Sequence, residues 1–264
     1  MTPTGDDAGQ DAGKDAGQAT GKDKSVDERA AELAAELAVI QQQAVGDRRT
    51  SARRVGEAVR TVIDLLTATS APSEVLDQAS DQLSAVVSLL SGYRADRTYE
   101  GLAEASGLGR EVAFFDWSPL LGRANPLAPP IQVEVEGGMI IGRVRFGSAY
   151  EGPPGCVHGG LIAAGFDEVL GLTQSLSGQA GMTGRLTVHY LRPTPLHTDL
   201  RFEGRLDGVS GRKVLTSCRL YARREVTAEA SGLFVTIPPD RFKAMAADRD
   251  RRGLTSSAHQ RGPG

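Results

Sequence analysis

The sequence predicts an α+β fold in which an antiparallel sheet wraps around one helix. Two alternating apolar and polar stretches, 131–135 and 139–146, flank the turn-forming Gly137-Gly138. An apolar run with helical spacing follows, from Gly159 to about Leu176. Two strands, one helix and four strands in this order are typical of an antiparallel sheet around a single helix. The four later strand-like runs are 183–191, 199–206, 212–222 and 226–237.

Composition limits the classes of function. The 264 residues leave room for one good domain and something smaller, and the net charge of -3 gives no reason to expect a nucleic-acid partner. Two cysteines are too few for a disulfide framework, no zinc spacing occurs, and a reducing cytoplasm fits. We expect no signal peptide, because the first residues have no apolar core, and no membrane partner, because no apolar run approaches about 18 residues.

The composition changes along the chain predict five parts. Residues 1–24 form a degenerate Asp-Ala-Gly repeat without large apolar residues, which predicts a disordered tail. A helical segment is expected over 25–92 and a Gly- and Pro-containing connector over 93–124. The main domain is expected over 125–242, followed by a polar, disordered tail over 243–264.

Three amphipathic helices are predicted in the helical segment: one over 25–44, one beginning near Ser51, and one after the break at 70–73. Each carries one apolar stripe, so we expect a small packed bundle or hairpin. A polar helical tail is the alternative. The connector that follows holds Phe114, Phe115 and Trp117, which we expect to pack onto the main domain.

The predicted helix 159–176 carries the strongest functional signal. Its apolar arc should be buried, and the remaining strip consists of tiny residues around a single carboxylate, Asp167. A buried carboxylate is costly unless it is paired or used, so Asp167 is a candidate catalytic residue. Glu168 lies about 100° around the helix from Asp167, at the border of the apolar arc. It is either a residue at the rim of a substrate site or a glutamate that packs against a neighbouring element. The strip consists of Gly160, Ala163, Ala164, Asp167 and Gly171.

The helix is expected to begin at His158-Gly159-Gly160. The first N–H groups of a helix have no intrahelical partner and carry the positive end of its dipole. Two glycines leave these groups open to a ligand, as an oxyanion hole for a carbonyl requires. A plain glycine turn is the alternative.

One distance predicts a homo-oligomer. Gly159 and Asp167 are eight residues apart, about 12 Å along a helix, so one carbonyl cannot contact both within a single chain. Two helices packed antiparallel along the small-residue strip would bring each Gly159 to the other chain's Asp167. We therefore expect a dimer or a dimer of dimers.

These residues resemble the hotdog-fold acyl-CoA thioesterases of the phenylacetyl-CoA thioesterase type. The resemblance rests on Gly155-Cys156-Val157-His158-Gly159-Gly160, the spacing to Asp167-Glu168, the Met182-Thr183 strand opening and Tyr190-Leu191-Arg192-Pro193. It covers roughly 125–237, under half of the chain. It implies a hotdog fold, preceded here by the helical segment, and a site with no metal or cofactor.

The resemblance also implies roles by position. The Gly159 N–H would polarise the thioester carbonyl, and Asp167 would be the nucleophile or the general base. His158 would orient the turn or face the thioester sulfur, and the Thr183 hydroxyl would position water. Some members carry an asparagine a few residues before the histidine, where this chain has Tyr-Glu-Gly-Pro-Pro-Gly-Cys, so that role is filled otherwise or is absent.

Three basic residues at predicted strand ends, Arg192, Arg212 and Lys213, are candidates for contact with the CoA phosphates or plain turn residues. The sequence therefore predicts a cytoplasmic enzyme that hydrolyses an acyl-CoA to a free acid and CoA. The alternative is a non-catalytic hotdog protein that binds acyl-CoA or another apolar ligand, with a helical segment that recruits a partner. The acyl group is not specified by the sequence.

Overall fold

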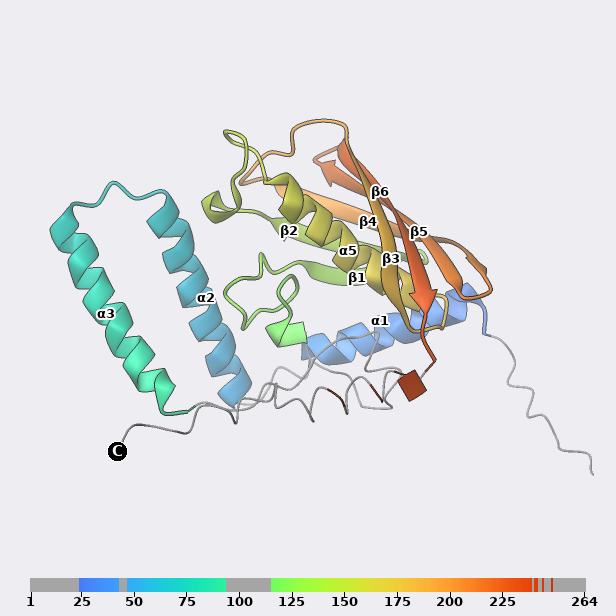
Figure 1. Ribbon diagram of the computed structural model, residues 1–264, viewed down its shortest axis with the longest axis horizontal. Helices are drawn as coiled ribbons and strands as arrows, with labels where there is room; N and C mark the ends of the chain where they lie inside the picture. Colours follow the sequence, from blue (N-terminus) through green and yellow to red (C-terminus); the bar gives the residue numbers. More distant parts are fainter. Residues whose placement is uncertain are drawn as a thin grey trace, which may run out of the picture.

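A computed structural model describes residues 24–42, 47–93 and 115–238, with isolated positions between 240 and 248. In this part of the chain a six-stranded antiparallel sheet curves around one central helix, α5 (Figure 1). The strand order is β1-β2-β4-β5-β6-β3, so the sequence-based prediction of a hotdog fold is confirmed. The helices are α1 (Val26–Gln42), α2 (Asp47–Thr67), α3 (Ser73–Ser91) and α5 (Gly159–Ser175), with short 3-10 turns η1 (Phe115–Trp117) and η2 (Ser148–Tyr150). The strands are β1 (Gln132–Glu136), β2 (Met139–Arg145), β3 (Gly181–Tyr190), β4 (Asp199–Ser210), β5 (Lys213–Ala222) and β6 (Glu225–Thr236).

The core lies between the inner face of the sheet and α5. Alternate side chains of β4 and β5 are buried, as expected of strands with one face on a core. Phe166 of α5 meets Phe202 of β4 edge-to-face, with ring centroids 5.2 Å apart. Gly204 allows this close approach, because a Cβ there would lie 2.2 Å from the Thr173 hydroxyl oxygen. The inner face therefore fixes the position and rotation of α5.

Helix α1 packs onto the sheet domain. Its stripe of Ala30, Leu33 and Leu37 is buried in the main core, and the helix lies along β1 (Figure 1). The Arg29 guanidinium donates a hydrogen bond of 2.7 Å to the carbonyl of Ser177, just after α5. The expectation that α1 joins a separate three-helix bundle is therefore wrong: its apolar stripe completes the hotdog core.

Helix α2 docks on the domain through its polar face. It begins at Asp47, earlier than the position near Ser51 that the sequence predicted. Arg53 donates a 2.7 Å hydrogen bond to the buried carboxylate of Asp116, and Gly56 lies so close to the main chain of Ala124 that a Cβ would be 2.7 Å from its carbonyl oxygen. The Arg60 guanidinium donates to the main-chain carbonyls of Arg123, Asn125 and Ala128.

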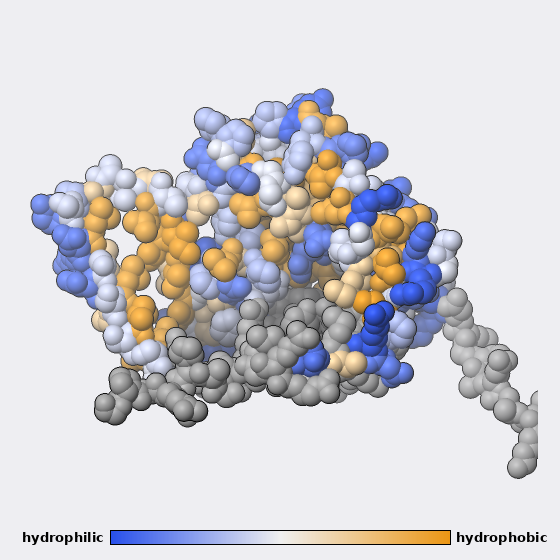
Figure 2. Space-filling view, in the orientation of Figure 1, coloured by the Kyte–Doolittle hydropathy of each residue, from blue (hydrophilic) through white to orange (hydrophobic). Residues whose placement is uncertain are grey.

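The apolar stripes of α2 and α3 remain uncovered. The two helices stand apart on either side of a gap and do not pack along their length (Figure 1), and α3 has no buried residue. Figure 2 shows apolar side chains lining both helices across an open gap. Within the described residues, the predicted packing of α2 against α3 is thus wrong. The N-cap of α3 is Pro72, without a side-chain hydrogen bond.

The segment between 115 and 131 packs onto the domain. Trp117, which we expected to pack there, is 40% exposed and therefore only partly covered; Phe114 and the side chain of Phe115 fall outside the described residues. Smaller side chains and one carboxylate are buried instead, which allows the main chain to lie close to α2. The buried residues are Asp116, Ser118, Leu121, Ala124, Ala128 and Ile131.

Replacing Asp116 with asparagine is expected to lower the free energy of unfolding by about 3 kcal/mol, because the Arg49 and Arg53 guanidiniums would lose their buried counter-charge. Urea denaturation measures the change, with Trp117 fluorescence reporting this segment and circular dichroism the whole fold. Asp199→Asn is the matched control, because its ion pair with Arg145 is exposed and should contribute less than about 1 kcal/mol. Equal effects of the two substitutions would contradict the prediction.

Candidate active site on helix α5 and strand β3

Helix α5 turns its small-residue strip away from the sheet. Ile162, Phe166, Val169 and Leu170 are buried against the strands. The strip predicted from the sequence is the least buried side of the helix, and Asp167 at its centre is exposed in the single chain. The expectation of a buried Asp167 is therefore wrong for one chain, because nothing in the described residues covers the strip.

The carboxylate of Asp167 is hydrogen-bonded to Thr183. The Thr183 hydroxyl donates to Asp167 Oδ1 at 2.8 Å. Thr183 lies near the start of β3, and the register with β6 shifts between Thr183 and Arg185, as a β-bulge does. A bulge redirects side chains locally, which suits a hydroxyl that must reach a helix. Helix and strand thus hold one acid and one hydroxyl together on the open face.

His158 is the N-cap of α5. Its side-chain Nδ1 accepts a 3.0 Å hydrogen bond from the Gly160 N–H, and its main-chain N–H donates to the Tyr150 carbonyl at 2.9 Å. A neutral imidazole with Nδ1 as acceptor carries its proton on Nε2. The expectation that both glycine N–H groups are open is wrong for Gly160, whose N–H the imidazole occupies. Gly159 has the first N–H of the helix, and no acceptor for it lies within the described residues.

Tyr190 is a site residue to which sequence reasoning assigned no role. Its hydroxyl donates to the Gly159 carbonyl at 2.8 Å, and its ring lies 3.5 Å from where a Gly159 Cβ would be. The last residue of β3 thereby holds the first residue of α5. The sequence places a tyrosine at the end of this strand, but periodicity does not indicate that its hydroxyl reaches across to the helix.

The edge of the sheet lies beside this site. Strand β3 is the last in the sheet order and pairs only with β6, so its other side has no neighbouring strand in the described part of the chain. Residues 182–185 of this strand are exposed. An unpaired edge is a template for another strand. The open strip of α5 and the open edge of β3 therefore form one continuous uncovered surface.

The remaining predicted residues are not gathered at one point. Glu168 is half-buried. Arg192 donates to the Val226 carbonyl at 3.0 Å, at the end of β3 near the helix N-terminus. Arg212 donates to the Thr236 carbonyl, and Lys213 pairs with Val235, so both lie at the opposite end of β6. Within one chain, these basic residues cannot bind one phosphate group together.

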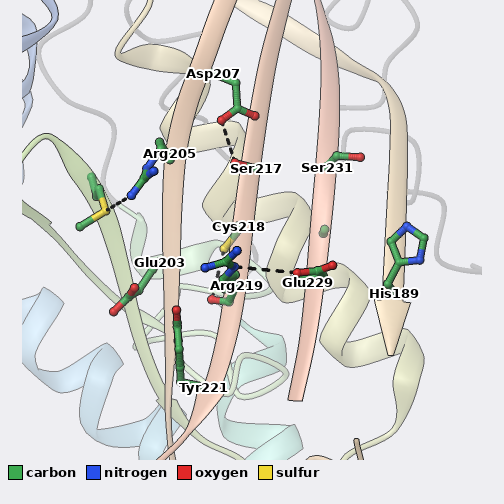
Figure 3. Close-up of a pocket in the computed structure, with 12 residues that line it drawn as sticks. His189, Glu203, Arg205, Asp207, Ser217, Cys218, Arg219, Tyr221, Glu229 and Ser231 are labelled. Atoms are coloured by element: carbon green, nitrogen blue, oxygen red, sulfur yellow. Dashed lines mark hydrogen bonds and ion pairs between the residues drawn. The ribbon is translucent and has the colours of Figure 1, made fainter. Parts of the chain in front are cut away.

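The outer face of the sheet carries a hollow of about 460 Å³ that is separate from this site. Figure 3 shows its charged lining over β4, β5 and β6, with α5 behind the strands. Glu203, Arg219, Glu229 and His189 face one another in register across four strands, so that one arginine stands between two acids and a histidine lies beside the second acid. These side chains point away from α5, because residues alternate between the two faces of a strand. The hollow therefore does not contribute to the Asp167 site.

A solved structure decides the family. The crystal structure of protein RHA08564, described as a thioesterase superfamily protein, is 35% identical in sequence and superimposes with a TM-score of 0.62. The match covers 70% of this chain and 90% of that one. The chain belongs to the thioesterase superfamily. The resemblance inferred from the histidine-glycine-glycine turn and its spacing to Asp167 is thereby confirmed at the level of the superfamily.

The other comparisons cover the site region. The family model for the thioesterase superfamily matches residues 154–229, which run from the turn before α5 into β6. Acyl-coenzyme A thioesterase THEM4 of Bos taurus is 37% identical over 97 residues, 36% of this chain and 40% of that protein. Acyl-coenzyme A thioesterase THEM5 of Homo sapiens is 33% identical over 93 residues, 34% of this chain and 38% of that protein. The chain thus spans about two fifths of the curated relatives it matches. No helix among the described residues is long and apolar enough to cross a membrane.

Proposed function

We propose that this superfamily member hydrolyses an acyl-CoA thioester to a carboxylic acid and CoA. The observation that carries the proposal is the hydrogen-bonded pair of Asp167 and Thr183 on the exposed strip of α5. The curated relatives that match this region are named acyl-coenzyme A thioesterases, which supports acyl-CoA as the substrate class. A reducing compartment such as the cytoplasm is part of the proposal, since Cys156 and Cys218 are both free thiols.

The reaction needs one hydrogen-bond donor to the thioester oxygen and one carboxylate that acts as a base or nucleophile. The Gly159 N–H at the positive end of α5 stabilises the charge that develops on the thioester oxygen. In the general-base form, Asp167 takes a proton from water while the water oxygen bonds to the carbonyl carbon. The carbon–sulfur bond then breaks, and the sulfur leaves as the CoA thiolate, which takes up a proton. Thr183 orients both the carboxylate and the water.

Asp167 can act as general base or as nucleophile. As a nucleophile, its oxygen bonds to the acyl carbon, CoA leaves, and water then cleaves the mixed anhydride. A single turnover in ¹⁸O-labelled water detects the nucleophilic route when water cleaves the anhydride at its aspartyl carbon. In the general-base route no label enters the carboxylate, whereas hydrolysis of the anhydride at its aspartyl carbon leaves label in Asp167, which mass spectrometry of the peptide detects.

The site requires two copies of the chain. The donor at Gly159 and the acid at Asp167 stand about 12 Å apart along α5, while each must come within about 3 Å of the same reacting group. The uncovered surface made by the α5 strip and the β3 edge fits a second copy related by a twofold axis. In such a pair Asp167 becomes buried between the two chains. Arg192 of each chain is then a candidate for contact with the CoA phosphates.

The decisive experiment is a panel of acyl-CoA substrates of varied chain length and aromaticity, with thiol release as the readout. At least one substrate should be turned over by the wild-type protein and far more slowly by Asp167→Asn. Binding of acyl-CoA by the wild-type protein without turnover of any substrate would favour the non-catalytic alternative, a hotdog protein that only binds the ligand.

Thr183→Ala is expected to lower kcat about tenfold, which corresponds to losing one hydrogen bond to a charged group in the transition state. Thr183→Ser is the matched control, because it keeps the hydroxyl that donates to Asp167 and should retain most of the activity. Thermal unfolding of both variants checks the fold. An unchanged kcat for Thr183→Ala, at normal stability, would show that the Thr183 hydroxyl has no role in turnover.

A further inference from the structure

Helix α2 is oriented with its apolar side away from the domain. Its contacts to the body come from Arg53, Gly56 and Arg60, which lie on one face of the helix. Val55 and Val62, on the other side, are 46% and 37% exposed. An amphipathic surface helix normally buries its apolar stripe. The reversed orientation leaves the apolar stripe of α2 facing away from the domain.

Helix α3 presents a second uncovered stripe. None of its 19 residues is buried, although Leu76, Leu83 and Leu90 recur at helical spacing along one side. A helix of this length is marginal in water without packing of its apolar face. The stripes of α2 and α3 face the same gap, and neither fills it (Figure 2).

The exposed apolar surface of the α2–α3 hairpin is large enough for a stable interface. Full burial of a leucine or valine side chain removes about 60–120 Å² from water, so the eleven exposed large apolar side chains of this hairpin, each about half exposed, present roughly 500 Å². A standard interface buries about 800 Å² per partner, of which somewhat more than half is apolar. The eleven are Val55, Val62, Leu65, Leu66, Val75, Leu76, Leu83, Val86, Val87, Leu89 and Leu90.

We propose that the α2–α3 hairpin is a second self-association surface, on which the same hairpin of another copy packs to close a four-helix core. A second copy supplies two further helices whose stripes also lack a partner, so that four stripes surround one core. A lone helix from another protein would bring one stripe and leave part of the gap open. A twofold axis through the gap makes the contact self-complementary.

This surface is distinct from the one at α5 and β3. The hairpin stands beside β1 and β2, while β3 lies at the far edge of the sheet (Figure 1). Pairing through both surfaces gives particles of four chains when the two twofold axes cross at right angles. The inference about the hairpin does not rest on the proposed hydrolysis, because it uses no residue of the Asp167 site.

The test places a charge on the apolar stripe of α3. Leu83→Lys should halve the particle mass measured by light scattering, from four chains to two. The monomer fold should persist, because Leu83 makes no buried contact in the single chain. Ser88→Lys is the matched control: it adds the same charge on the same helix, about 140° around from Leu83, and should leave the mass unchanged. Circular dichroism and acyl-CoA turnover per chain are measured on all three proteins.

The outcomes separate the two interfaces. A fall from four chains to two with turnover retained supports the proposal and leaves the Asp167 site paired. A fall from two chains to one also supports the hairpin contact but counts against the pairing through α5. An unchanged mass for Leu83→Lys overturns the proposal, and an accompanying drop in melting temperature would mean that another part of the same chain covers the stripe. A monomeric wild-type protein overturns it as well.

Discussion

Asp167→Asn is expected to lower kcat for acyl-CoA hydrolysis by at least about a hundredfold, the scale associated with loss of a general base. An amide keeps the size of the side chain and still accepts a hydrogen bond from the Thr183 hydroxyl, so the fold should be unaffected. It can neither take a proton from water nor form a mixed anhydride. Initial-rate measurements over a range of substrate concentrations separate kcat from KM.

Glu168→Gln serves as the matched control for this substitution. It removes a carboxylate one residue away, on a different side of the same helix, and leaves the Asp167–Thr183 pair intact. Its kcat should stay within a few-fold of the wild-type value. If Glu168→Gln lost more activity than Asp167→Asn, the reactive face of α5 would be the one carrying Glu168.

Gly159→Pro is expected to abolish nearly all turnover in a pure preparation, because it removes the proposed oxyanion donor. The structure favours a folded variant: Gly159 is the first residue of α5, where proline is well tolerated. The preceding His158 has an extended backbone, with φ -58° and ψ 129°, as a residue before proline requires. Gly159→Ala is the control that keeps the N–H, and its methyl group would meet the Tyr190 ring at an ordinary contact distance of 3.5 Å.

Mixing the two inactive chains tests the shared site. A heterodimer of Asp167→Asn and Gly159→Pro has one site with both groups intact and one with neither. With random reassortment half of the dimers are mixed, so the mixture should regain up to about a quarter of the wild-type activity. Proven heterodimers without recovery would place both groups in one chain, or would remove Gly159 as the donor.

The fold was largely predictable because its signals are local. Alternation in 131–135 and 139–146 and the helical run from Gly159 predicted β1, β2 and α5 within a few residues. The position of Asp167 on a strip of small residues followed from the helical period alone. The exposure of that strip did not, because periodicity gives the face of a residue but not what lies against it.

The errors have the same physical origin. The stripes of α2 and α3 are real, but a stripe does not reveal whether its partner is the same chain or another, and α2 docks through arginines and a glycine instead. Gly160 looked open because the sequence does not show that the preceding imidazole bends back to its N–H. The hydrogen bond from Tyr190 to Gly159 joins residues that are distant in sequence, so the spacing of apolar residues does not indicate it.

The position of β3 determines when the site can assemble. Among the described strands its one neighbour is β6, the last of them in sequence, and Thr183 stands opposite Phe234 in that pairing. A chain emerging from the ribosome carries Asp167 on α5 well before the strand that anchors Thr183 exists, and this long loop must close before the two can meet. Until then β3 has no partner on either side and is exposed to wrong partners. Chains cut before Glu225 would keep Asp167 but lose the strand that anchors Thr183, so we expect an incomplete protein to lack the proposed activity.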